Sequence, residues 1–249
     1  MEQLSLFSEL SLHPESSVEL GEAERQVWAS ETSLGRLSDR PLLIGVDEAG
    51  RGPWAGPVVA AAVILPEGLG VHQALPASLR KLNDSKKLTE HHRSELIKPI
   101  CQIALAVGVG IRSASRIDEV NIAQANFEAM REALDQALRA LDRRMMNERA
   151  HVRLAMIDGK FPIPNYPLPQ SPLIKGDQRS LHIAAASIIA KVTRDKIMIA
   201  ADRRFPSYGF AQHKGYGTRA HQHALSTFGP TPLHRKSYRP VREVIERSP

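Results

Sequence analysis

Residues 42–57 read LLIGVDEAGRGPWAGP, and this stretch decides the fold and the chemistry of the chain. An apolar run from Leu42 to Val46 ends in two adjacent carboxylates, Asp47 and Glu48. Gly and Pro residues follow at once, which is typical of a strand that stops at the edge of a sheet. Two neighbouring acids are costly to hold there without a cation. Mg2+ or Mn2+ suits them because both ions take carboxylate oxygens as ligands.

The turn behind the two acids places one arginine, Arg51, between Gly50 and Gly52. Glycine lets backbone N–H groups approach a ligand closely, and a guanidinium beside them favours a phosphate. For a lone Asp-Glu pair, however, a solvated strand end is by far the commoner explanation. The hypothesis of phosphoryl chemistry therefore requires further acids elsewhere in the chain.

Two later apolar runs end in an acid in the same way. Residues 152–157 lead into Asp158 and a glycine, and a short predicted strand over residues 173–177 ends in Asp177. Active groups of an α/β sheet gather at strand ends beside a crevice, so we expect these acids to converge with the first two. Four carboxylates carry too much negative charge without cations, and two divalent ions are the natural complement. Two ions about 4 Å apart can activate a water and stabilise the leaving oxygen of a phosphoryl displacement.

The rest of the pattern alternates between strands and helices. Residues 58–65 and 103–111 read as strands, residues 90–100, 115–146 and 179–204 as helices, and the proline-rich residues 161–172 as a loop. From residue 203 onward, nine basic and two acidic residues are interleaved with aromatic ones. That mixture suits a helical cap with its aromatics packed inward, and it also suits binding to a nucleic-acid backbone.

The composition is that of a soluble globular protein, with 42% apolar and 24% charged residues among 249. The single cysteine, Cys101, excludes a disulfide framework and any multi-cysteine zinc site, and it fits a reducing compartment. No stretch approaches the roughly 20 apolar residues of a membrane span, and the acidic N-terminus lacks the basic region of a signal peptide. We therefore expect a cytoplasmic protein without a membrane segment.

Charge is distributed unevenly along the chain. Residues 1–40 hold eight acidic and three basic residues, a net charge of −5, whereas the whole chain has +6. The remainder therefore carries +11, and this surplus indicates a polyanionic partner. Charge placed for solubility alone is the competing explanation.

Residues 1–40 show no sustained periodicity and are interpreted as a flexible extension, with a short helix near residues 22–29, ahead of one domain over residues 41–249. Near its start the extension reads QLSLF, which resembles the short peptides by which bacterial DNA enzymes bind the replication sliding clamp. In such a peptide, Leu6 and Phe7 would fill an apolar pocket and Gln3 would be a polar anchor beside Leu4. Chance is the competing explanation of a match over five residues.

Other catalytic patterns are missing. The sequence holds no GxxxxGK[ST] phosphate loop, no HExxH zinc helix and no GxSxG elbow. Adjacent histidines do not share a helix face, and a pair two residues apart shares a face only on a strand, so we expect the pairs at 91–92 and 221/223 to face solvent. His182 lies in an apolar stretch and is expected in the core.

Eight blocks together resemble the signature of type 2 ribonuclease H, the ribonuclease HII family. The blocks are GVDEAGRGP at residues 45–53, NDSKKL at 83–88, IDG at 157–159, KGD at 175–177, AASIIAKVTRD at 185–195, YGF at 208–210, HKGY at 213–216 and HRKSY at 234–238. They occur in family order and cover residues 42–245. Small departures, such as Lys160 after the Asp-Gly pair and Tyr238 in place of a phenylalanine, do not touch the acids.

The resemblance implies a ribonuclease H-like α/β fold, with a five-stranded mixed sheet flanked by helices and a C-terminal helical cap from about residue 203. It implies cleavage of RNA in RNA–DNA hybrids and incision 5′ to a single ribonucleotide embedded in duplex DNA, leaving 3′-hydroxyl and 5′-phosphate ends. By the same resemblance, two Mg2+ or Mn2+ ions would be held by Asp47, Glu48, Asp158 and Asp177.

The resemblance also implies the residues that bind the substrate. The Gly50-Arg51-Gly52 turn would read the 2′-hydroxyl and phosphates at the RNA–DNA junction, with Tyr216 against the ribose. Candidate phosphate contacts are Lys86, Lys87, Lys191 and Arg194.

Three other interpretations stay open at this point. A metal nuclease of the same fold, such as a junction resolvase, would not require a 2′-hydroxyl, and the Gly-Arg-Gly turn argues against it. A non-catalytic module that binds hybrids would use the acids structurally. A clamp-tethered scaffold would rest on residues 3–7 alone and would not explain the core. Nothing in the pattern requires more than a monomer.

Overall fold

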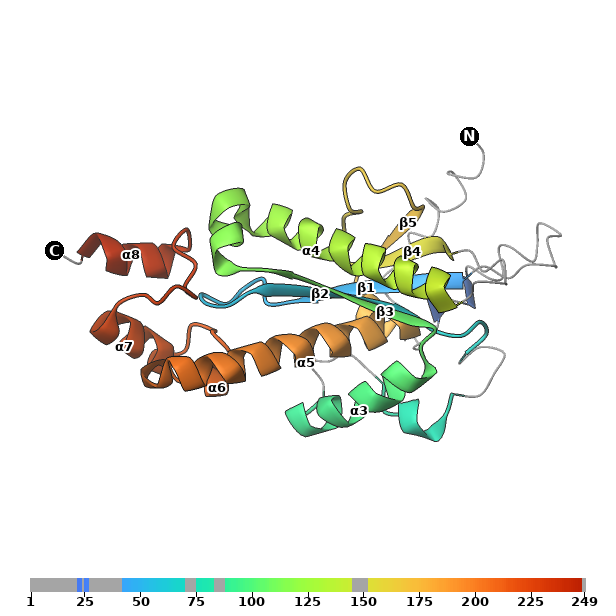
Figure 1. Cartoon of the computed structure of the whole chain (residues 1–249), viewed down its shortest axis with the longest axis horizontal. Coiled ribbons are helices and arrows are strands. Elements are labelled where there is room, and N and C mark those ends of the chain that lie inside the picture. The colour runs from blue at the N-terminus through green and yellow to red at the C-terminus, as the bar shows by residue number, and fades with distance from the viewer. Residues whose placement is uncertain are drawn as a thin grey trace.

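The computed structural model describes residues 22–23, 25–26, 42–69, 75–82, 88–144 and 152–247. Its centre is the predicted five-stranded mixed sheet, and the strands lie in the order β3-β2-β1-β4-β5 (Figure 1). The strands are β1 (Leu42–Ala49), β2 (Val58–Ile64), β3 (Ala106–Arg112), β4 (Val152–Asp158) and β5 (Gln170–Leu173). Strand β1 pairs antiparallel with β2 and parallel with β4, and β4 pairs parallel with β5. Because β1 is central and Val46 lies opposite Ile157, the acids that follow these two residues reach the same edge.

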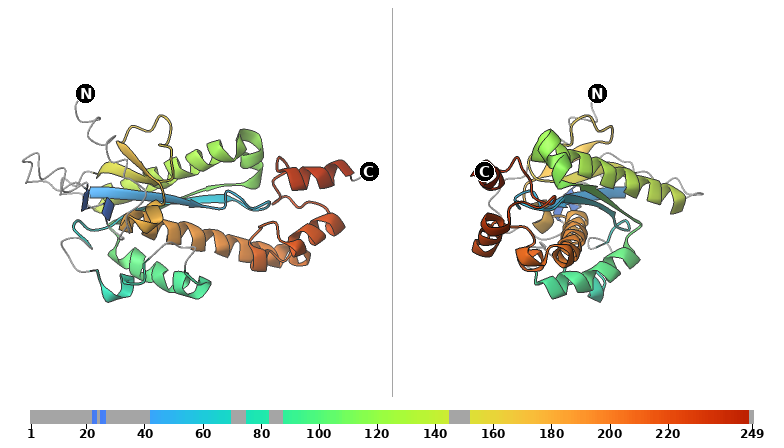
Figure 2. Two further views of the ribbon diagram at one scale, coloured as in Figure 1. Left: turned by 180° about the vertical axis from the view of Figure 1, so that it is seen from behind. Right: turned by 60° about the vertical axis from the view of Figure 1, so that its left-hand side comes forward.

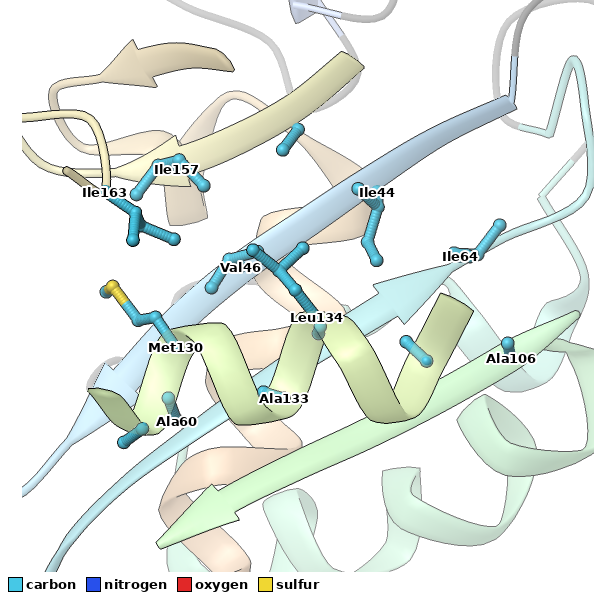
Figure 3. Packing of buried hydrophobic residues seen from close by; sticks show 14 of the residues in the cluster. Ile44, Val46, Ala60, Ile64, Ala106, Met130, Ala133, Leu134, Ile157 and Ile163 are labelled. Carbon is cyan, nitrogen blue, oxygen red and sulfur yellow. The ribbon is translucent and has the colours of Figure 1, made fainter. Parts of the chain in front are cut away.

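One face of the sheet is covered by α4 (Ala114–Arg144) (Figures 1 and 2). Glycines on β3 allow a close approach, since a Cβ at Gly108 would lie 2.0 Å from the Ala133 carbonyl oxygen. Figure 3 shows the resulting core, in which Leu134 points from the helix toward Val46, and Ile157 lies beside Ile163. Met130, Leu134 and Leu141 of this helix are buried in the core.

The opposite face is covered by α5 (Leu181–Arg204) and α3 (Glu90–Ile103). Ser180 caps the start of α5, and its side-chain oxygen accepts a hydrogen bond from the Ile183 N–H at 3.2 Å. A Cβ at Gly45 would lie 2.2 Å from the His182 carbonyl carbon, so β1 requires glycine where it crosses the start of this helix. This contact brings the start of α5 against the strand that carries the first two acids.

The C-terminal region is helical, as predicted. It consists of η4 (Pro206–Tyr208), α6 (Phe210–His213), α7 (Arg219–Phe228) and α8 (Arg239–Arg247). These helices lie at the end of the sheet where β1 stops and β2 begins (Figure 1). The described residues also contain the short helices η1 (Ala77–Leu79) and η3 (Gly176–Gln178). No helix among the described residues is long and apolar enough to cross a membrane.

The structure corrects the predicted bounds of one strand and the predicted continuity of the long helix. A loop was predicted over residues 161–172 and a strand over 173–177. The strand β5 instead spans Gln170–Leu173, so it begins within the predicted loop and ends at the first residue of the predicted strand. Pro172 is tolerated there since β5 is an edge strand, and Lys175 ends the extended segment with a φ of 54°. The helix predicted over 115–146 contains a kink at Asn121, with φ 70° and ψ 165°. The Asn121 side chain then caps a new helical turn by accepting hydrogen bonds from the N–H groups of Ala123 and Gln124.

Candidate active site

Four carboxylates meet at one edge of the sheet. Asp47 and Glu48 end β1, and Asp158 ends β4. Asp177 lies in η3, directly before α5. The carboxylate of Asp158 accepts a hydrogen bond from the Gly176 N–H at 2.8 Å, which ties the end of β4 to the turn that carries the fourth acid. All four residues therefore lie together as the sequence predicted, although Asp177 arrives on a helical turn.

Burial and mutual repulsion govern the electrostatics of this cluster. Burial raises the pKa of Asp47 well above its usual value, and three neighbouring acids raise it further: Asp158, Glu48 and Asp177. Burial also raises the pKa of Glu48, although the Arg51 guanidinium acts in the opposite direction. The ionised forms are thus disfavoured in the protein alone, and a bound cation would relieve that penalty.

The donor set fits a hard divalent cation, because every candidate ligand is a carboxylate oxygen. In the conformations seen here, however, no three His, Cys, Asp or Glu side chains of the described residues form a group that could hold an ion. The pKa shifts show that the acids interact electrostatically. The cluster therefore matches such an ion by charge and chemistry, without presenting a ready-made coordination sphere.

Asn126 on α4 is a neighbour of this cluster that no sequence pattern indicates. Its amide is buried, and a hydrogen bond from it lowers the pKa of Glu48 against the effect of burial. An asparagine within a helical, mostly apolar stretch carries no signal that it faces a catalytic edge. Only the packing of α4 over β1 reveals it.

The Gly50-Arg51-Gly52 turn presents two different sides. Gly50 is buried with a φ of 98°, and a Cβ there would lie 2.1 Å from the Arg194 Nε. The side chain of Arg51 is 58% exposed and contacts the Glu48 carboxylate at 3.3 Å. Gly52 is exposed, with open space around the position of a Cβ. The turn is therefore packed on one side and open on the other, beside the acids.

The prediction that Arg194 contacts a phosphate is contradicted by its position. Its side chain is fully buried, and its guanidinium donates to the carbonyl oxygens of Pro57 (2.9 Å), Lys214 (2.9 Å) and Ala55 (3.0 Å). These bonds tie residues 55–57, which follow the turn, to the C-terminal region. Arg194 is therefore a structural anchor of the segment after the turn.

A second buried arginine, Arg235, was not singled out from the sequence. Its guanidinium donates to the carbonyl oxygens of Gly50, Arg51, Gly56 and Pro57 and to the hydroxyl of Tyr238. Arginine is rarely fully buried unless paired. Here its partners are carbonyls of a turn 178–185 residues away, which no local pattern indicates.

The other predicted phosphate contacts are three lysines, of which the structure describes one. Lys191 is half-buried and forms an ion pair with Asp195 at 2.7 Å, and burial lowers its pKa. Its contact with a phosphate stays a prediction. The candidates Lys86 and Lys87 lie outside the described residues, as do Gln3, Leu4, Leu6 and Phe7.

Tyr216 lies beside the turn and is 46% exposed. The guanidinium carbon of Arg194 lies 5.9 Å from the centre of its ring. The preceding carbonyl, that of Gly215, accepts a hydrogen bond from the Trp54 N–H at 2.9 Å. The turn and the tyrosine are thus held together through Arg194 and Trp54.

The prediction for the histidine pair at 221/223 is wrong for its first member. His223 is exposed, but His221 is fully buried and packs in an aromatic cluster with His234. The expected burial of His182 is confirmed. The spacing of two histidines on a helix could not indicate the burial of His221, because its cluster is formed by α7 together with the loop that carries His234.

Acid is expected to destabilise the protein between about pH 6.5 and pH 4 through these histidines. Burial lowers the pKa of His221 and His234 to about 4 in the folded protein, from an ordinary value of 6.5. As the pH falls, the unfolded chain binds protons first, so stability present above pH 6.5 is lost toward pH 4. One histidine contributes at most roughly 3 kcal/mol to this loss, and the pair less than twice that, because their titrations are coupled.

Urea unfolding at pH 7 and pH 5 measures this effect. In His234→Gln, which retains a donor but does not titrate in this range, the stability lost between the two pH values should be smaller by about 1–2 kcal/mol. The exposed His223→Gln is the matched control and should lose as much as the unmodified protein. Equal losses in all three proteins would contradict the expected role of the buried pair.

Comparison with known proteins gives a consistent assignment. The model of the family described as Ribonuclease HII matches residues 44–241. A ribonuclease HII of Geotalea daltonii is 46% identical over 231 residues, covering 93% of this chain and 98% of the relative. The ribonuclease H2 structure from Pyrococcus horikoshii OT3 is 25% identical with a TM-score of 0.60, covering 83% of this chain and 98% of that one. The RNase HII of Archaeoglobus fulgidus, solved in complex with PCNA, is 26% identical with a TM-score of 0.56, covering 80% and 95%. The chain therefore belongs to the ribonuclease HII family and is a ribonuclease H, an endonuclease that hydrolyses RNA paired with DNA.

Proposed function

We propose that this ribonuclease H also incises 5′ to a single ribonucleotide embedded in duplex DNA. The proposed reaction is a two-metal-ion hydrolysis that leaves 3′-hydroxyl and 5′-phosphate ends. The observation that carries the proposal is the position of the Gly50-Arg51-Gly52 turn. Arg51 of this turn contacts Glu48 of the carboxylate cluster, and Arg194 packs between Gly50 and Tyr216. Buried Arg235 bonds to the backbone carbonyls of Gly50 and Arg51.

Asp47, Glu48, Asp158 and Asp177 are the residues proposed to hold the two ions, Mg2+ or Mn2+. Such ions supply an activated water and stabilise charge on the leaving oxygen. The chain itself supplies a buried, negatively charged edge whose acids repel one another, which favours cation binding. Arg51, which contacts Glu48, is well placed to bind a substrate phosphate next to the acids.

The turn and the tyrosine are proposed to recognise the junction between ribose and deoxyribose. The 2′-hydroxyl is the one group that separates RNA from DNA at a given base, so recognition requires groups close to the sugar. The exposed side of the turn can approach the sugar at Gly52, where no side chain intervenes. The ring of Tyr216 offers a flat apolar face for the neighbouring sugar.

A labelled DNA duplex with one ribonucleotide, incubated with and without Mg2+ or Mn2+, tests the proposal. The expected result is a single cut 5′ to the ribonucleotide that a chelator abolishes. Cleavage of a continuous RNA–DNA hybrid without any cut at the single ribonucleotide would contradict the proposed junction recognition. Cleavage of neither substrate would contradict the catalytic assignment as a whole.

Replacement of Tyr216 by alanine should reduce incision at the single ribonucleotide by about tenfold or more, because the sugar loses an aromatic contact. Tyr216→Phe retains the ring and should retain most of the activity. Both rates are measured as kcat/KM on the duplex with one ribonucleotide and on a continuous hybrid. Equal activity of the alanine variant and the unmodified enzyme on the first substrate would remove Tyr216 from the proposed site.

The N-terminal peptide QLSLF is proposed to bind the bacterial sliding clamp. Its support is the sequence resemblance at Gln3, Leu4, Leu6 and Phe7. The PCNA complex of the Archaeoglobus fulgidus enzyme shows that one relative binds a clamp. Deletion of residues 1–8 should abolish retention on immobilised clamp and leave cleavage of free substrate unchanged. Retention of the shortened protein would contradict the proposal.

Three further assignments are part of the proposal. Phosphate contacts are proposed for Lys86, Lys87 and Lys191, each testable by alanine substitution and hybrid binding at several salt concentrations. A cytoplasmic location and a monomeric state are proposed as well. Cell fractionation and sedimentation of the purified protein measure them.

A further inference from the structure

The backbone around Tyr216 is held in place although the tyrosine ring is exposed. The Tyr216 N–H donates to the His213 carbonyl oxygen at 2.9 Å, and the Tyr216 carbonyl oxygen accepts from the Thr218 N–H at 2.8 Å. Tyr216 stands between Gly215, whose φ is 83°, and Gly217. Two flanking glycines would leave the ring free to sample many orientations, so its direction depends on such outside contacts.

The side chain of His221 supplies a further contact from beneath the segment. Its Nδ1 lies 2.9 Å from the Tyr216 carbonyl oxygen, and its Nε2 lies 3.0 Å from the Nε2 of His234. The imidazole is fully buried between the ring of Trp54, at 5.5 Å, and the stacked ring of His213, at 4.4 Å. The backbone N–H of Trp54 in turn donates to the Gly215 carbonyl oxygen, so Trp54 and His221 together support the carbonyls of Gly215 and Tyr216, one on each side of the tyrosine.

The partners of these imidazoles determine where the protons lie. The Nδ1 of His234 accepts a hydrogen bond from the Thr231 N–H at 2.9 Å, so the proton of this neutral ring is on Nε2. His234 therefore donates to the Nε2 of His221, which must be unprotonated. The proton of His221 is consequently on Nδ1, where it is donated to the Tyr216 carbonyl oxygen. Burial lowers the pKa of both rings and keeps them neutral, as this arrangement requires.

We propose that His221, set in one tautomer by His234, is a positioning residue for Tyr216 in the recognition of the RNA–DNA junction. This inference rests on the proposed function and adds the residues that orient the tyrosine from behind. In a buried site a directed N–H···O bond restricts the backbone more strongly than it would in water. An apolar side chain of similar volume would fill the space without restricting the carbonyl.

The test compares His221→Asn with His221→Leu. The asparagine amide nitrogen can occupy nearly the same place as Nδ1 and donate to the Tyr216 carbonyl, whereas leucine fills the space without a donor. The quantity measured is the junction preference, the ratio of kcat/KM on a duplex with one ribonucleotide to kcat/KM on a continuous hybrid. His221→Leu should lower this ratio by about ten- to a hundredfold, mainly through kcat on the first substrate, and His221→Asn should retain most of it.

A double-mutant cycle shows whether His221 acts through Tyr216. In the Tyr216→Ala background, His221→Leu should cause no further loss of junction preference, because the group being positioned is already missing. Independent, additive losses would overturn the inference. So would an unchanged junction preference in His221→Leu alone.

His223→Leu is the matched control, since it makes the same change on an exposed position two residues along α7. It should leave the junction preference unchanged. If His221→Leu does not fold, His221→Gln takes its place, because its amide lies one bond too far from the backbone to replace Nδ1. If the unmodified enzyme itself shows no junction preference, the proposed function fails. If the enzyme shows a junction preference that depends on Tyr216 but not on His221, the proposed function stands and only the positioning role of His221 fails.

Discussion

Asp47→Asn should abolish cleavage while making the free protein more stable. Asn preserves the shape of the side chain and can still accept the hydrogen bond that the Glu48 N–H donates to Asp47 at 2.6 Å. It cannot supply a negative charge, so we expect the rate on RNA–DNA hybrids to fall roughly a thousandfold or more. The central position of Asp47, whose pKa is raised by three other acids, makes it the most sensitive member of the cluster.

The stability gain follows from the sign of the pKa shift. A carboxyl group whose pKa is raised in the folded protein stabilises the fold below its ordinary pKa, and that contribution is lost as the pH rises through the raised value. At neutral pH the unfolded chain carries Asp47 ionised, so folding must either bury this charge or bind a proton, and the neutral amide avoids that cost. We therefore expect the free energy of unfolding of the metal-free protein to rise at neutral pH.

Thermal unfolding with and without Mg2+ or Mn2+ completes this test. A ligand that binds only the folded state raises the midpoint, so the ions should stabilise the unmodified protein more than Asp47→Asn. Asp142→Asn, the same chemical change at an exposed position of α4, should alter neither activity nor the response to ions. Near-normal turnover of Asp47→Asn would refute the carboxylate site.

The acids could be predicted from the sequence because their signal is local. Asp47 and Asp158 each follow an apolar run directly, and paired strands that end at one edge must deliver such residues together. Asp177 was predicted at the end of a strand, but it lies on a helical turn beyond Lys175, whose left-handed backbone no propensity indicates. Its convergence with the others was still correct, because the turn is tied back to Asp158.

The supporting contacts could not be predicted because their partners are distant in the chain. Arg194 was expected to contact a phosphate, yet its partners are the carbonyls of Ala55 and Pro57. His221 was expected in solvent, yet His234 and Tyr216 complete its hydrogen bonds inside the protein. In both cases the side chain is buried because a loop elsewhere offers backbone groups that need a partner.

Arg235 and Arg51 should give opposite results, although both are arginines that contact the same turn. The buried guanidinium of Arg235 bonds to four carbonyls of residues 50–57. Arg235→Leu leaves these acceptors without their donor, so we expect the free energy of unfolding to fall by about 3–5 kcal/mol. Arg51 is largely exposed, with one contact to Glu48. Arg51→Leu should therefore change stability by no more than about 0.5 kcal/mol.

For substrate recognition by the folded protein, we expect Arg51→Leu to have the larger effect and Arg235→Leu the smaller one. Arg51→Leu should reduce kcat/KM at a single ribonucleotide by about tenfold or more, because a charge-assisted phosphate contact is lost. Urea unfolding and the two cleavage assays, run on the same preparations, separate the effects. A stable Arg235→Leu would show that the turn holds its shape without the guanidinium, and a fully active Arg51→Leu would show that the exposed arginine does not bind the substrate. If each of the two substitutions lowered both stability and recognition, then neither arginine would serve only to support the turn or only to bind the substrate.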